Sequence, residues 1–329
     1  MSVSILCSVL GGLAFFLYGM WMMRANLEAA AGERLARILE EMTSSPLRGL
    51  FAGIAVTMLL QSSSAVMVIL IGLVSAGLLS LGQAIWLILG ANIGTTVTGQ
   101  LLAFDIGPLA CLLAFVGIVL MLAGREGWKT AGGILGGIGL LFLGMEQMGA
   151  ALAPLGQQEQ MQDFLAKCSH PTAGILAGTS ITAVIQSSSG AIGILQTLAR
   201  EGLVTLDQCI YQVFGQNIGT CATAFLALLG TRRGEGRPGE ERPGKGRAAR
   251  KVALLHLLVN VIGTVFFTAF CQLLPVVEWL EALTPGDVPR QIANVHTFFN
   301  VGTMVVVAPF GARLARWMEV AGVPGKGKN

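Results

Sequence analysis

The stretch Gln61-Ser62-Ser63-Ser64 decides how this chain folds, and the chain spells it a second time as Gln186-Ser187-Ser188-Ser189. Each copy places four uncharged polar side chains between apolar runs, which are residues 47–60 and 65–79 for the first copy. In hydrocarbon, a hydroxyl or amide without a partner costs roughly 2–7 kcal/mol. These side chains therefore face a cavity, other polar groups or a ligand, and two copies predict one site assembled from both.

The surroundings of the two copies repeat as well, at a distance of 125 residues. No gap is needed between residues 11–98 and their partners, and 18 of the 38 positions from Gln61 to Thr98 are identical. Two independent apolar stretches would rarely agree so well, which indicates an internal duplication. The second repeated motif is Gly90-Ala91-Asn92-Ile93-Gly94-Thr95-Thr96, and its partner begins Gly215-Gln216-Asn217-Ile218-Gly219-Thr220.

The composition is that of a polytopic membrane protein. Of the 329 residues 53% are hydrophobic and 12% are charged, with a mean hydropathy of +0.71, whereas soluble domains carry about 25% charged residues. The first apolar run, residues 5–23, lacks the basic start and the cleavage site of a signal peptide, and we interpret it as a membrane span. The six cysteines show no spacing typical of disulfides or metal ligands, so no transition-metal site is expected.

Seven segments are candidates for crossing a bilayer, whose hydrocarbon core needs about 20 residues. They are residues 4–23, 81–104, 107–123, 130–150, 205–230, 252–275 and 292–312. Residues 24–42 carry apolar side chains at helical spacing with charges between them, which predicts a helix lying in the interface. Residues 47–79 and 172–200 are each too long for one upright span and, when broken at the serines, too short for two. They predict re-entrant hairpins with the serines at their tips, where irregular backbone lines a cavity.

The expected fold is an all-α polytopic membrane protein with two inverted-topology repeats, each containing a re-entrant helical hairpin and a broken transmembrane helix. Residues 1–125 form the first repeat, residues 126–275 the second, and residues 276–329 a final span and a cytoplasmic tail. Residues 231–251 are rich in glycine and basic side chains, which predicts a disordered cytoplasmic loop. Anionic lipid or nucleic acid could bind such a loop, but we interpret it as a solvated linker and expect no nucleic-acid partner.

Inversion follows from counting crossings. With hairpins each unit crosses the membrane three times, so the second unit is inverted relative to the first. One side then carries 18 of the 21 Lys and Arg residues, and the other carries Lys167, Arg200 and Arg290. The positive-inside rule places the C-terminus in the cytoplasm and the N-terminus outside the cell (inner) membrane. Arg125 and Lys129 separate the models, because they are cytoplasmic with hairpins and external if each serine segment crosses fully.

The two motifs predict an ion site without a fixed charge. Gly and Asn tolerate backbone outside the helix, so the Asn-Ile-Gly-Thr turns are expected to interrupt their spans. An unwound turn frees carbonyls for Na⁺, and the N-terminus of a half-helix favours an anion. Neither motif contains a charged residue, so co-bound cations would have to neutralise an oxyanion. A potential of about 100 mV opposes each entering negative charge by roughly 2.3 kcal/mol, which makes sodium coupling the physical expectation.

Paired Gln-Ser-Ser-Ser motifs, each followed 31 residues later by an Asn-Ile-Gly-Thr turn, resemble the type II sodium/phosphate cotransporter family in its bacterial form. The resemblance covers nearly the whole chain and implies import of inorganic phosphate by alternating access, with sodium as coupling ion and no organic cofactor. The implied phosphate ligands are Ser62, Ser63, Ser64, Ser187, Ser188 and Ser189. The implied sodium ligands, or supports of the hairpin tips, are Gln61, Gln186, Asn92, Thr95, Asn217 and Thr220.

Two features depart from the family pattern. Many bacterial members append a cytoplasmic helical regulatory domain, whereas this sequence ends at Asn329. Cys221 stands where the first unit has Thr96, so an oxygen ligand is missing at that position of the second unit.

Several of these residues have structural alternatives. Asn92 and Asn217 could cap half-helices, both motif glutamines could be scaffold, and serines in membrane helices commonly bond to their own turn. His256-x-x-x-Asn260 and His296-x-x-x-Asn300 form a further pair that also resembles the family. We interpret this pair as interhelical hydrogen bonding, with a proton relay or pH sensor as the alternative.

Other functions are compatible with parts of the pattern. The cargo could be a different oxyanion, the coupling ion could be a proton, or the pocket could form a passive anion channel. An intramembrane hydrolase would use Ser63 or Ser188 as nucleophile and His256 or His296 as base. The serines lack a GxS-type elbow and no carboxylate is placed to orient a histidine, so we expect no enzyme.

Overall fold

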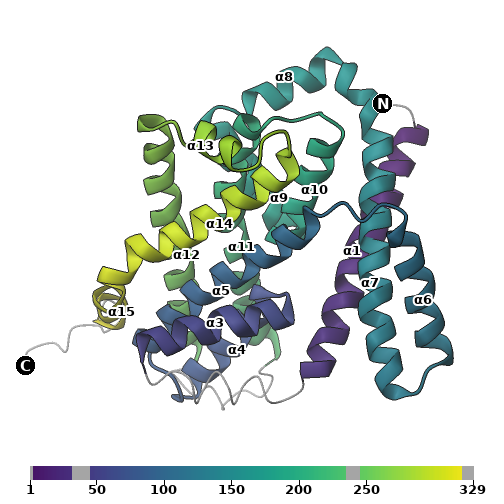
Figure 1. Cartoon of the computed structure of the whole chain (residues 1–329). Helices are drawn as coiled ribbons and strands as arrows, with labels where there is room; N and C mark the ends of the chain where they lie inside the picture. Colours follow the sequence, from purple (N-terminus) through teal and green to yellow (C-terminus); the bar gives the residue numbers. More distant parts are fainter. Residues whose placement is uncertain (1–2, 32–44, 235–244, 321–329) are drawn as a thin grey trace, which may run out of the picture.

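The computed structural model describes residues 3–31, 45–234 and 245–320, and every regular element in these ranges is a helix (Figure 1). The α-helices are α1 (Val3–Ala31), α3 (Pro46–Leu60), α4 (Ser63–Ser75), α5 (Leu81–Leu102), α6 (Leu109–Ala123), α7 (Glu126–Leu152), α8 (Glu159–Lys167), α9 (Pro171–Ile185), α10 (Ser188–Arg200), α11 (Leu206–Gly234), α12 (Lys245–Leu273), α13 (Val276–Leu283), α14 (Val288–Val307) and α15 (Gly311–Val320). Short 3-10 segments, η2 (Ala153–Gln157) and η3 (Ala308–Phe310), extend α7 and α14.

The helices confirm an all-helical membrane protein. Each of the seven predicted spans corresponds to a helix, and five helical stretches of the described chain are long and apolar enough to cross a bilayer. These five are Val3–Ala31, Leu81–Leu102, Gly127–Gly156, Arg247–Leu273 and Val288–Val320. The helices of the other two predicted spans, α6 with 15 residues and α11, are not among these five. The helices beside the serines are shorter, with 15 residues in α3 and α9 and 13 in α4 and α10.

Two predicted segments differ from the structure at their ends. Residues 24–31 continue α1 without a break, so no separate interfacial helix starts at Arg24, and residues 32–44 of that prediction lie outside the described residues. The helix α11 continues to Gly234 and α12 begins at Lys245, so both ends of the predicted loop 231–251 are helical. Ala, Arg and Lys dominate residues 245–251 and are strong helix formers; residues 235–244 again lie outside the described chain.

The backbone breaks where the serine motifs stand, as the sequence predicts. Gln61 ends α3 and Gln186 ends α9, both in the left-handed conformation with φ of 52° and 59°. They are the only non-glycine residues of the described chain with positive φ. Extended Ser62 and Ser187 then cap the next helices, because their hydroxyls accept the amides of Ala65 and Gly190. Each motif therefore forms a helix–break–helix unit.

The prediction that the Asn-Ile-Gly-Thr motifs break their helices is wrong. The helices α5 and α11 run through both motifs without interruption. The polar side chains bond within the helix instead: Thr95 donates to the Ala91 carbonyl and Thr220 to the Gln216 carbonyl, both at 2.9 Å. This back-bonding satisfies a threonine hydroxyl without unwinding the turn.

The motif glycines serve helix packing. A Cβ on Gly90 would collide with the Leu50 carbonyl, and one on Gly215 would collide with the carbonyl of Ile175, which is the repeat partner of Leu50. Gly94 and Gly219 meet Thr57 and Thr182 in the same way. The contacts between α3 and α5 therefore recur between α9 and α11, so the duplication in the sequence is also a duplication in three dimensions.

The repeat-equivalent helices α1 and α7 run antiparallel. Gly12 packs on the backbone of Gly144 and Met148, whereas Gly19 packs on Gly137 and Leu141. Gly137 and Gly144 are themselves the repeat partners of Gly12 and Gly19, so each glycine contacts the partner of the other. This reciprocal pattern is that of a local two-fold axis between the two helices.

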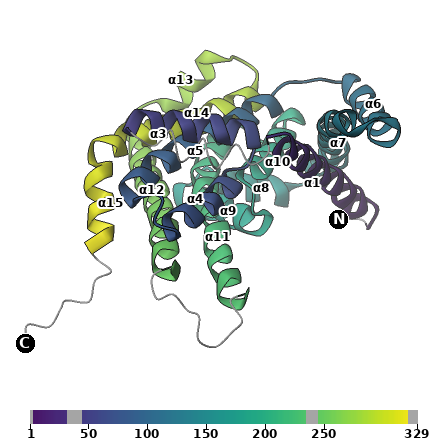
Figure 2. The same cartoon turned by 90° about the horizontal axis from the view of Figure 1, so that it is seen from below.

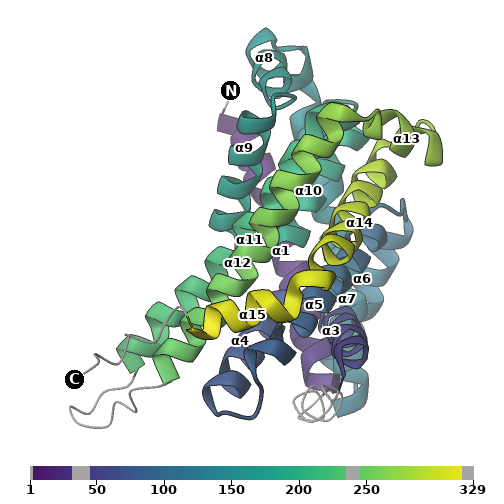
Figure 3. The same cartoon turned by 90° about the vertical axis from the view of Figure 1, so that its left-hand side faces the viewer.

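The helices form two groups. Figures 1 and 2 show α1, α6 and α7 side by side, next to a larger group that contains the two helix–break–helix units and α14. Figure 3 shows α8 at one end of the molecule and α15 at the other, and the turn between α6 and α7 lies at the α15 end (Figure 1). Buried aromatic side chains fill the larger group, where Phe214 stacks on Phe299 with ring centroids 5.0 Å apart.

Candidate binding site between the serine motifs

The two serine motifs line one cavity, although 125 residues separate them in the chain. The cavity has a volume of about 10 Å³ and is lined by Arg24, Gln61, Ser62, Ser63, Ser64, Gln186, Ser187, Ser188, Ser189 and Thr220. About 10–15 Å³ is the minimum for a single water molecule. The walls are therefore closed around the site, and an oxyanion needs them to separate.

Two helix N-termini meet at this cavity. The hydroxyls of Ser62 and Ser187 cap α4 and α10 by accepting the amide three residues further on. The preceding amides, of Ser63 and Ser64 and of Ser188 and Ser189, have no carbonyl within their own helices to bond to. Each helix end also carries roughly half a positive charge from its dipole. Four amide donors and two positive dipole ends therefore lie at the cavity and favour an anion. The C-terminal ends of α3 and α9, capped by Gln61 and Gln186, bring two negative dipole ends to the same breaks.

The serine hydroxyls connect the two units directly. Ser64 Oγ donates to Thr223 Oγ1 at 3.3 Å, which joins the first motif to α11. Ser187 Oγ donates to Met20 Sδ at 3.9 Å, which joins the second motif to α1. The serines of the second copy are the more enclosed, since Ser187, Ser188 and Ser189 are all buried, whereas Ser63 is the one buried serine of the first copy.

Arg24 overturns the expectation of a pocket without fixed charge. It reaches the cavity from α1, and its Nη2 donates to Ser187 Oγ at 3.3 Å. The other nine lining residues are Gln, Ser or Thr, so no carboxylate belongs to the lining. The motif sequences give no sign of Arg24, because it lies 37 residues before the first motif. The one signal is that Arg24 is the first charged residue after the apolar run 5–23.

The predicted sodium ligands fall into two groups. Gln61, Gln186 and Thr220 line the cavity, whereas Asn92, Thr95 and Asn217 are not among its lining residues. Gln61 is held at both ends, because its Nε2 donates to the Met58 carbonyl and its Oε1 accepts from Thr98 Oγ1, both at 2.6 Å. The Gln186 side chain is exposed. The repeat partners Gln61 and Gln186 therefore have different surroundings.

Asn92 belongs to a buried network that ties the two units together. Its Nδ2 donates to Asn260 Oδ1 at 2.9 Å, and its Oδ1 lies 3.3 Å from His256 Nε2. Asn260 Nδ2 in turn lies 3.3 Å from Cys221 Sγ. The network joins α5, α11 and α12, as the interpretation of His256 and Asn260 as interhelical bonding predicts. Cys221, the residue that departs from the repeat, is its end point.

His296 and Asn300 do not copy this arrangement. Both side chains are buried. Within the described chain, the two ring nitrogens of His296 and the Oδ1 of Asn300 have no hydrogen-bond partner. Asn300 Nδ2 donates to the His296 carbonyl of its own helix at 2.8 Å. Asn260 Nδ2 makes the equivalent bond to the His256 carbonyl at 3.1 Å, so the two pairs share their intrahelical bond and differ in the bonds across helices.

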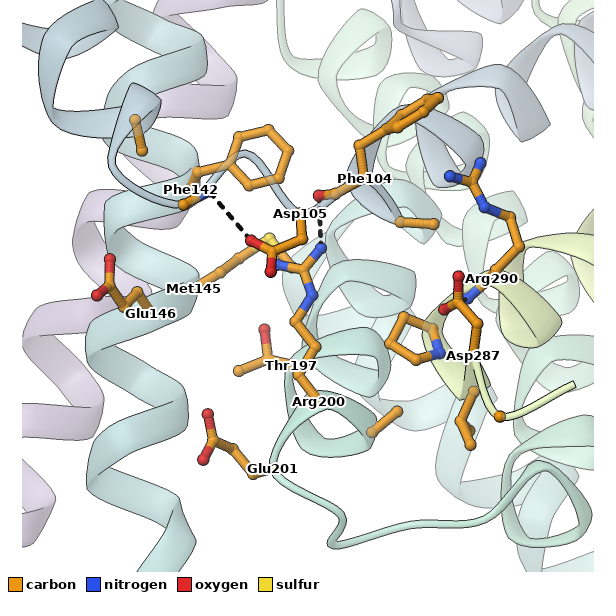
Figure 4. Close-up of a pocket in the computed structure, with 17 residues that line it drawn as sticks. Phe104, Asp105, Phe142, Met145, Glu146, Thr197, Arg200, Glu201, Asp287 and Arg290 are labelled. Carbon is orange, nitrogen blue, oxygen red and sulfur yellow. Dashed lines mark hydrogen bonds between the residues drawn. The ribbon is translucent and has the colours of Figure 1, made fainter. Parts of the chain in front are cut away.

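A second, larger cavity opens near the end of α5 (Figure 4). Its volume is about 720 Å³, and its charged lining residues are Asp105, Glu146, Arg200, Glu201, Asp287 and Arg290. Arg200 Nη2 donates to the carbonyls of Leu102 and Phe104, both at 2.7 Å. Arg290 lies over the Phe104 ring at 4.3 Å and donates to the Gln100 carbonyl. Both arginines thus bond to carbonyls at or just beyond the C-terminal end of α5, and four carboxylates share the cavity with the two guanidinium groups.

Two copies of one family model match this chain. The model is the Na⁺/Pi-cotransporter family, and the copies match residues 15–150 and 144–283. The chain belongs to the Na⁺/Pi-cotransporter family. It is accordingly a multi-pass membrane transporter and not an enzyme, and the duplication of the family domain agrees with the repeat of 125 residues. The finer division into residues 1–125, 126–275 and 276–329 stays a prediction.

Individual relatives of the Na⁺/Pi-cotransporter family are similar over different lengths. "Uncharacterized protein YqeW" of Bacillus subtilis is 34% identical over 306 residues, which is 93% of this chain and 94% of the relative. "Putative inorganic phosphate export protein YjbB" of Escherichia coli is 27% identical over 318 residues, or 95% of this chain and 55% of that protein. "Sodium-dependent phosphate transport protein 2A" of Rattus norvegicus is 38% identical over 97 residues, or 29% of this chain and 15% of that protein. No solved structure matches the chain.

Proposed function

We propose that this chain transports inorganic phosphate together with sodium, driven by the sodium gradient. Phosphate binds between the two serine motifs. The observation that carries the proposal is the single cavity lined by both motifs, at which two helix N-termini and Arg24 converge. Family membership supports phosphate and sodium as the ions. The proposed phosphate ligands are the six motif serines, with the first-turn amides of α4 and α10 as additional donors.

The arrangement of the helices supports two inverted repeats with re-entrant hairpins. The equivalent helices α1 and α7 are antiparallel, and α3, α4, α9 and α10 have at most 15 residues, or about 22 Å of helix. In our proposal each helix–break–helix unit enters the bilayer and returns, so that the serines lie near the midplane. In this proposal the protein lies in the cell (inner) membrane, with its C-terminus in the cytoplasm and its N-terminus outside. The larger cavity near Arg200 then opens to the outside.

Closed walls around the site support alternating access. The cavity admits about one water molecule, so phosphate binds in conformations in which the two motifs lie further apart. Helices α1 and α10 supply the facing residues Arg24 and Ser187. We propose that the group of α1, α6 and α7 and the larger group move against each other, which opens the site to one side at a time.

Sodium ligands are proposed among the oxygen-bearing side chains at the cavity and just before the two backbone breaks. Gln61 and Thr220 line the cavity, and Thr57 and Thr182 occupy equivalent positions one turn before the motif glutamines. Both threonines are fully buried, and neither hydroxyl has a hydrogen-bond partner in the described residues. A cation beside either threonine would satisfy its hydroxyl, since hard cations prefer oxygen ligands. Asn92, Thr95, Asn217 and Gln186 complete the proposed set as supports of these positions.

The direction of transport is a proposal of its own. An inward sodium gradient favours phosphate import, and import is the direction that we propose. The name of the Escherichia coli relative favours export, which the same cycle performs when internal phosphate is high enough to outweigh the sodium gradient. Proteoliposomes distinguish the two cases, because sodium and phosphate can be placed on either side.

Uptake of labelled phosphate tests the proposal. Purified protein in proteoliposomes is expected to take up phosphate when external Na⁺ is present and to lose this uptake when Na⁺ is replaced by K⁺ or choline. Ser63→Ala and Ser188→Ala should each lower the rate at least tenfold, because each removes a hydroxyl from the anion site. The control Ser4→Ala changes an exposed serine of α1 and should retain the wild-type rate.

The alternatives give different results in this assay. Uptake that is indifferent to sodium but follows a pH gradient would establish proton coupling. Flux that does not saturate with phosphate would establish a passive channel. Uptake of sulfate in preference to phosphate would show that the cargo is another oxyanion, and full activity of Ser188→Ala would remove the serine motifs from the site.

A further inference from the structure

Arg24 occupies a position that the sequence motifs do not predict. It lies on α1 of the first unit, and its guanidinium bonds to Ser187 of the second unit at 3.3 Å. Ser187 Oγ also accepts the Gly190 amide at 3.1 Å. The Nε of Arg24 is buried and has no hydrogen-bond partner among the described residues. Arginine presents several donors in one plane, so this side chain has capacity for a further acceptor.

The charge of Arg24 is not balanced within the cavity. No carboxylate lines it, and the one acidic residue of α1, Glu28, is exposed and does not belong to the lining. A charge taken from water without a partner is costly. The two helix N-termini at the same cavity add further positive potential. The formal charge of the lining is therefore that of one guanidinium, which attracts an anion.

The second unit has no counterpart of Arg24. The equivalent position is Gly149, which has no side chain, and a Cβ there would meet the Glu201 carboxylate. The two serine motifs are thus alike in sequence but not in charge. The second copy, Ser187 to Ser189, has the guanidinium beside it and is also the more buried of the two.

We infer that Arg24 is the fixed countercharge of the bound oxyanion and replaces one of the sodium ions that a charge-free pocket would require. This inference rests on the proposed function and names the residue that neutralises phosphate within it. Guanidinium groups bind phosphate oxygens through two parallel hydrogen bonds, and the unpartnered Nε together with a terminal nitrogen supplies such a pair. On binding, phosphate replaces Ser187 Oγ as the acceptor of the guanidinium.

Titration of the full-length protein in detergent tests the inference. Inorganic phosphate is added at several Na⁺ concentrations and in K⁺ buffer, and binding is measured by calorimetry and by the shift in Tm. Wild type is expected to retain weaker phosphate binding in K⁺. Arg24→Gln should bind phosphate about ten- to hundredfold more weakly, as expected for a lost charged hydrogen bond, and only when Na⁺ is present. Arg24→Lys should lose less than about fivefold, because it keeps the charge.

Controls separate this inference from the proposed function. Arg316→Gln removes an exposed arginine of α15 whose Nε bonds to its own helix, and it should bind as wild type does. Without ligand, Arg24→Gln should keep or exceed the wild-type Tm, because it removes the desolvation cost of an unpaired charge. If wild type binds phosphate and Arg24→Gln matches it in affinity and sodium dependence, Arg24 is not the countercharge. A parallel titration with sulfate tests the proposed function separately. If wild type binds sulfate but not phosphate, and Arg24→Gln loses sulfate binding, Arg24 is the countercharge of an oxyanion and phosphate is not the substrate.

Discussion

At the scale of single residues, the same amide side chain has two roles in the two units. Asn92 bonds across helices to Asn260 and lies beside His256. Its repeat partner Asn217 donates to the Val213 carbonyl of its own helix. A buried cross-helix bond stabilises the fold, whereas an intrahelical bond leaves the amide oxygen available for another partner. The pair therefore offers an internal comparison between a structural asparagine and a candidate sodium ligand.

Substitution of the two asparagines should separate these roles. Asn92→Ala leaves Asn260 and His256 without their partner, which costs about 1–3 kcal/mol for each unsatisfied group. We expect a clear loss of Tm in detergent for Asn92→Ala. For Asn217→Ala we expect a smaller loss of Tm and a higher sodium concentration for half-maximal phosphate uptake.

The control for this comparison is Asn294→Ala, because the half-buried Asn294 of α14 bonds to Gln100 and Thr284 and does not line the cavity between the motifs. An Asn217→Ala variant with normal sodium dependence would remove Asn217 from the sodium site. Equal Tm values for Asn92→Ala and wild type would show that the buried network contributes nothing to stability.

At the scale of elements, glycine decides where two helices touch. In both units the backbone of α5 or α11 lies directly on the backbone of α3 or α9, because Gly90 and Gly215 carry no side chain. Close approach through small residues is the common mode of helix association in membranes. This contact positions the end of α3 and of α9, and with them the left-handed glutamines and the serine caps.

An added methyl group at either glycine should push the helices apart. Gly90→Ala and Gly215→Ala are each expected to lower stability by about 1–3 kcal/mol, as overpacking does, and to reduce phosphate uptake by displacing the serines. The matched control is Gly72→Ala in α4, because a Cβ at Gly72 meets nothing within 4 Å. It should be neutral or slightly stabilising, since alanine favours helix.

The Tm of the purified variants checks the expected loss of stability, and phosphate uptake in proteoliposomes checks the expected loss of transport. Wild-type Tm for Gly90→Ala and Gly215→Ala would mean that α3 and α9 are not held by these contacts. A loss for one glycine only would show that the two units differ in packing despite their common sequence.

At the scale of the whole molecule, the fold separates the chain into two ends. The helix α8 lies at one end, and α15 and the α6–α7 turn lie at the other (Figures 1 and 3). This arrangement is what the hairpin topology requires, since it places Arg125 and Lys129 on the side of α15. If each serine segment crossed fully, the α6–α7 turn would lie on the opposite side.

Labelling from the two faces of the membrane tests the topology. In a background without native cysteines, Lys129→Cys and Arg316→Cys should react with a membrane-impermeant maleimide only from the cytoplasmic face. Lys167→Cys, at the end of α8, should react only from outside. Reaction of positions 129 and 316 from opposite faces would refute the inverted arrangement, whereas exchange of all three labelling faces would refute only the orientation of the termini.

Chemistry that is local in sequence could be read from the sequence alone. Apolar runs without charge fix the helices, because hydrocarbon forces every backbone group into an internal hydrogen bond. The polar motifs fix the backbone breaks after Gln61 and Gln186, and the period of 125 residues fixes the duplication. The Asn-Ile-Gly-Thr motifs led to the wrong prediction of broken helices, because glycines that permit unwinding also permit close packing of helices. Only the position of the neighbouring helix shows which of the two occurs.

The tertiary structure alone decided the composition of the site. It placed Arg24 beside Ser187, 163 residues away, because α1 and α7 pack through their glycines and bring the end of α1 against the second unit. It also joined Asn92 to His256 across 164 residues. Periodicity and motif spacing describe neighbours along the chain, whereas the charge in the cavity depends on which helices lie side by side. For that reason the sequence predicts the hydroxyls of this site, and only the fold supplies its positive charge.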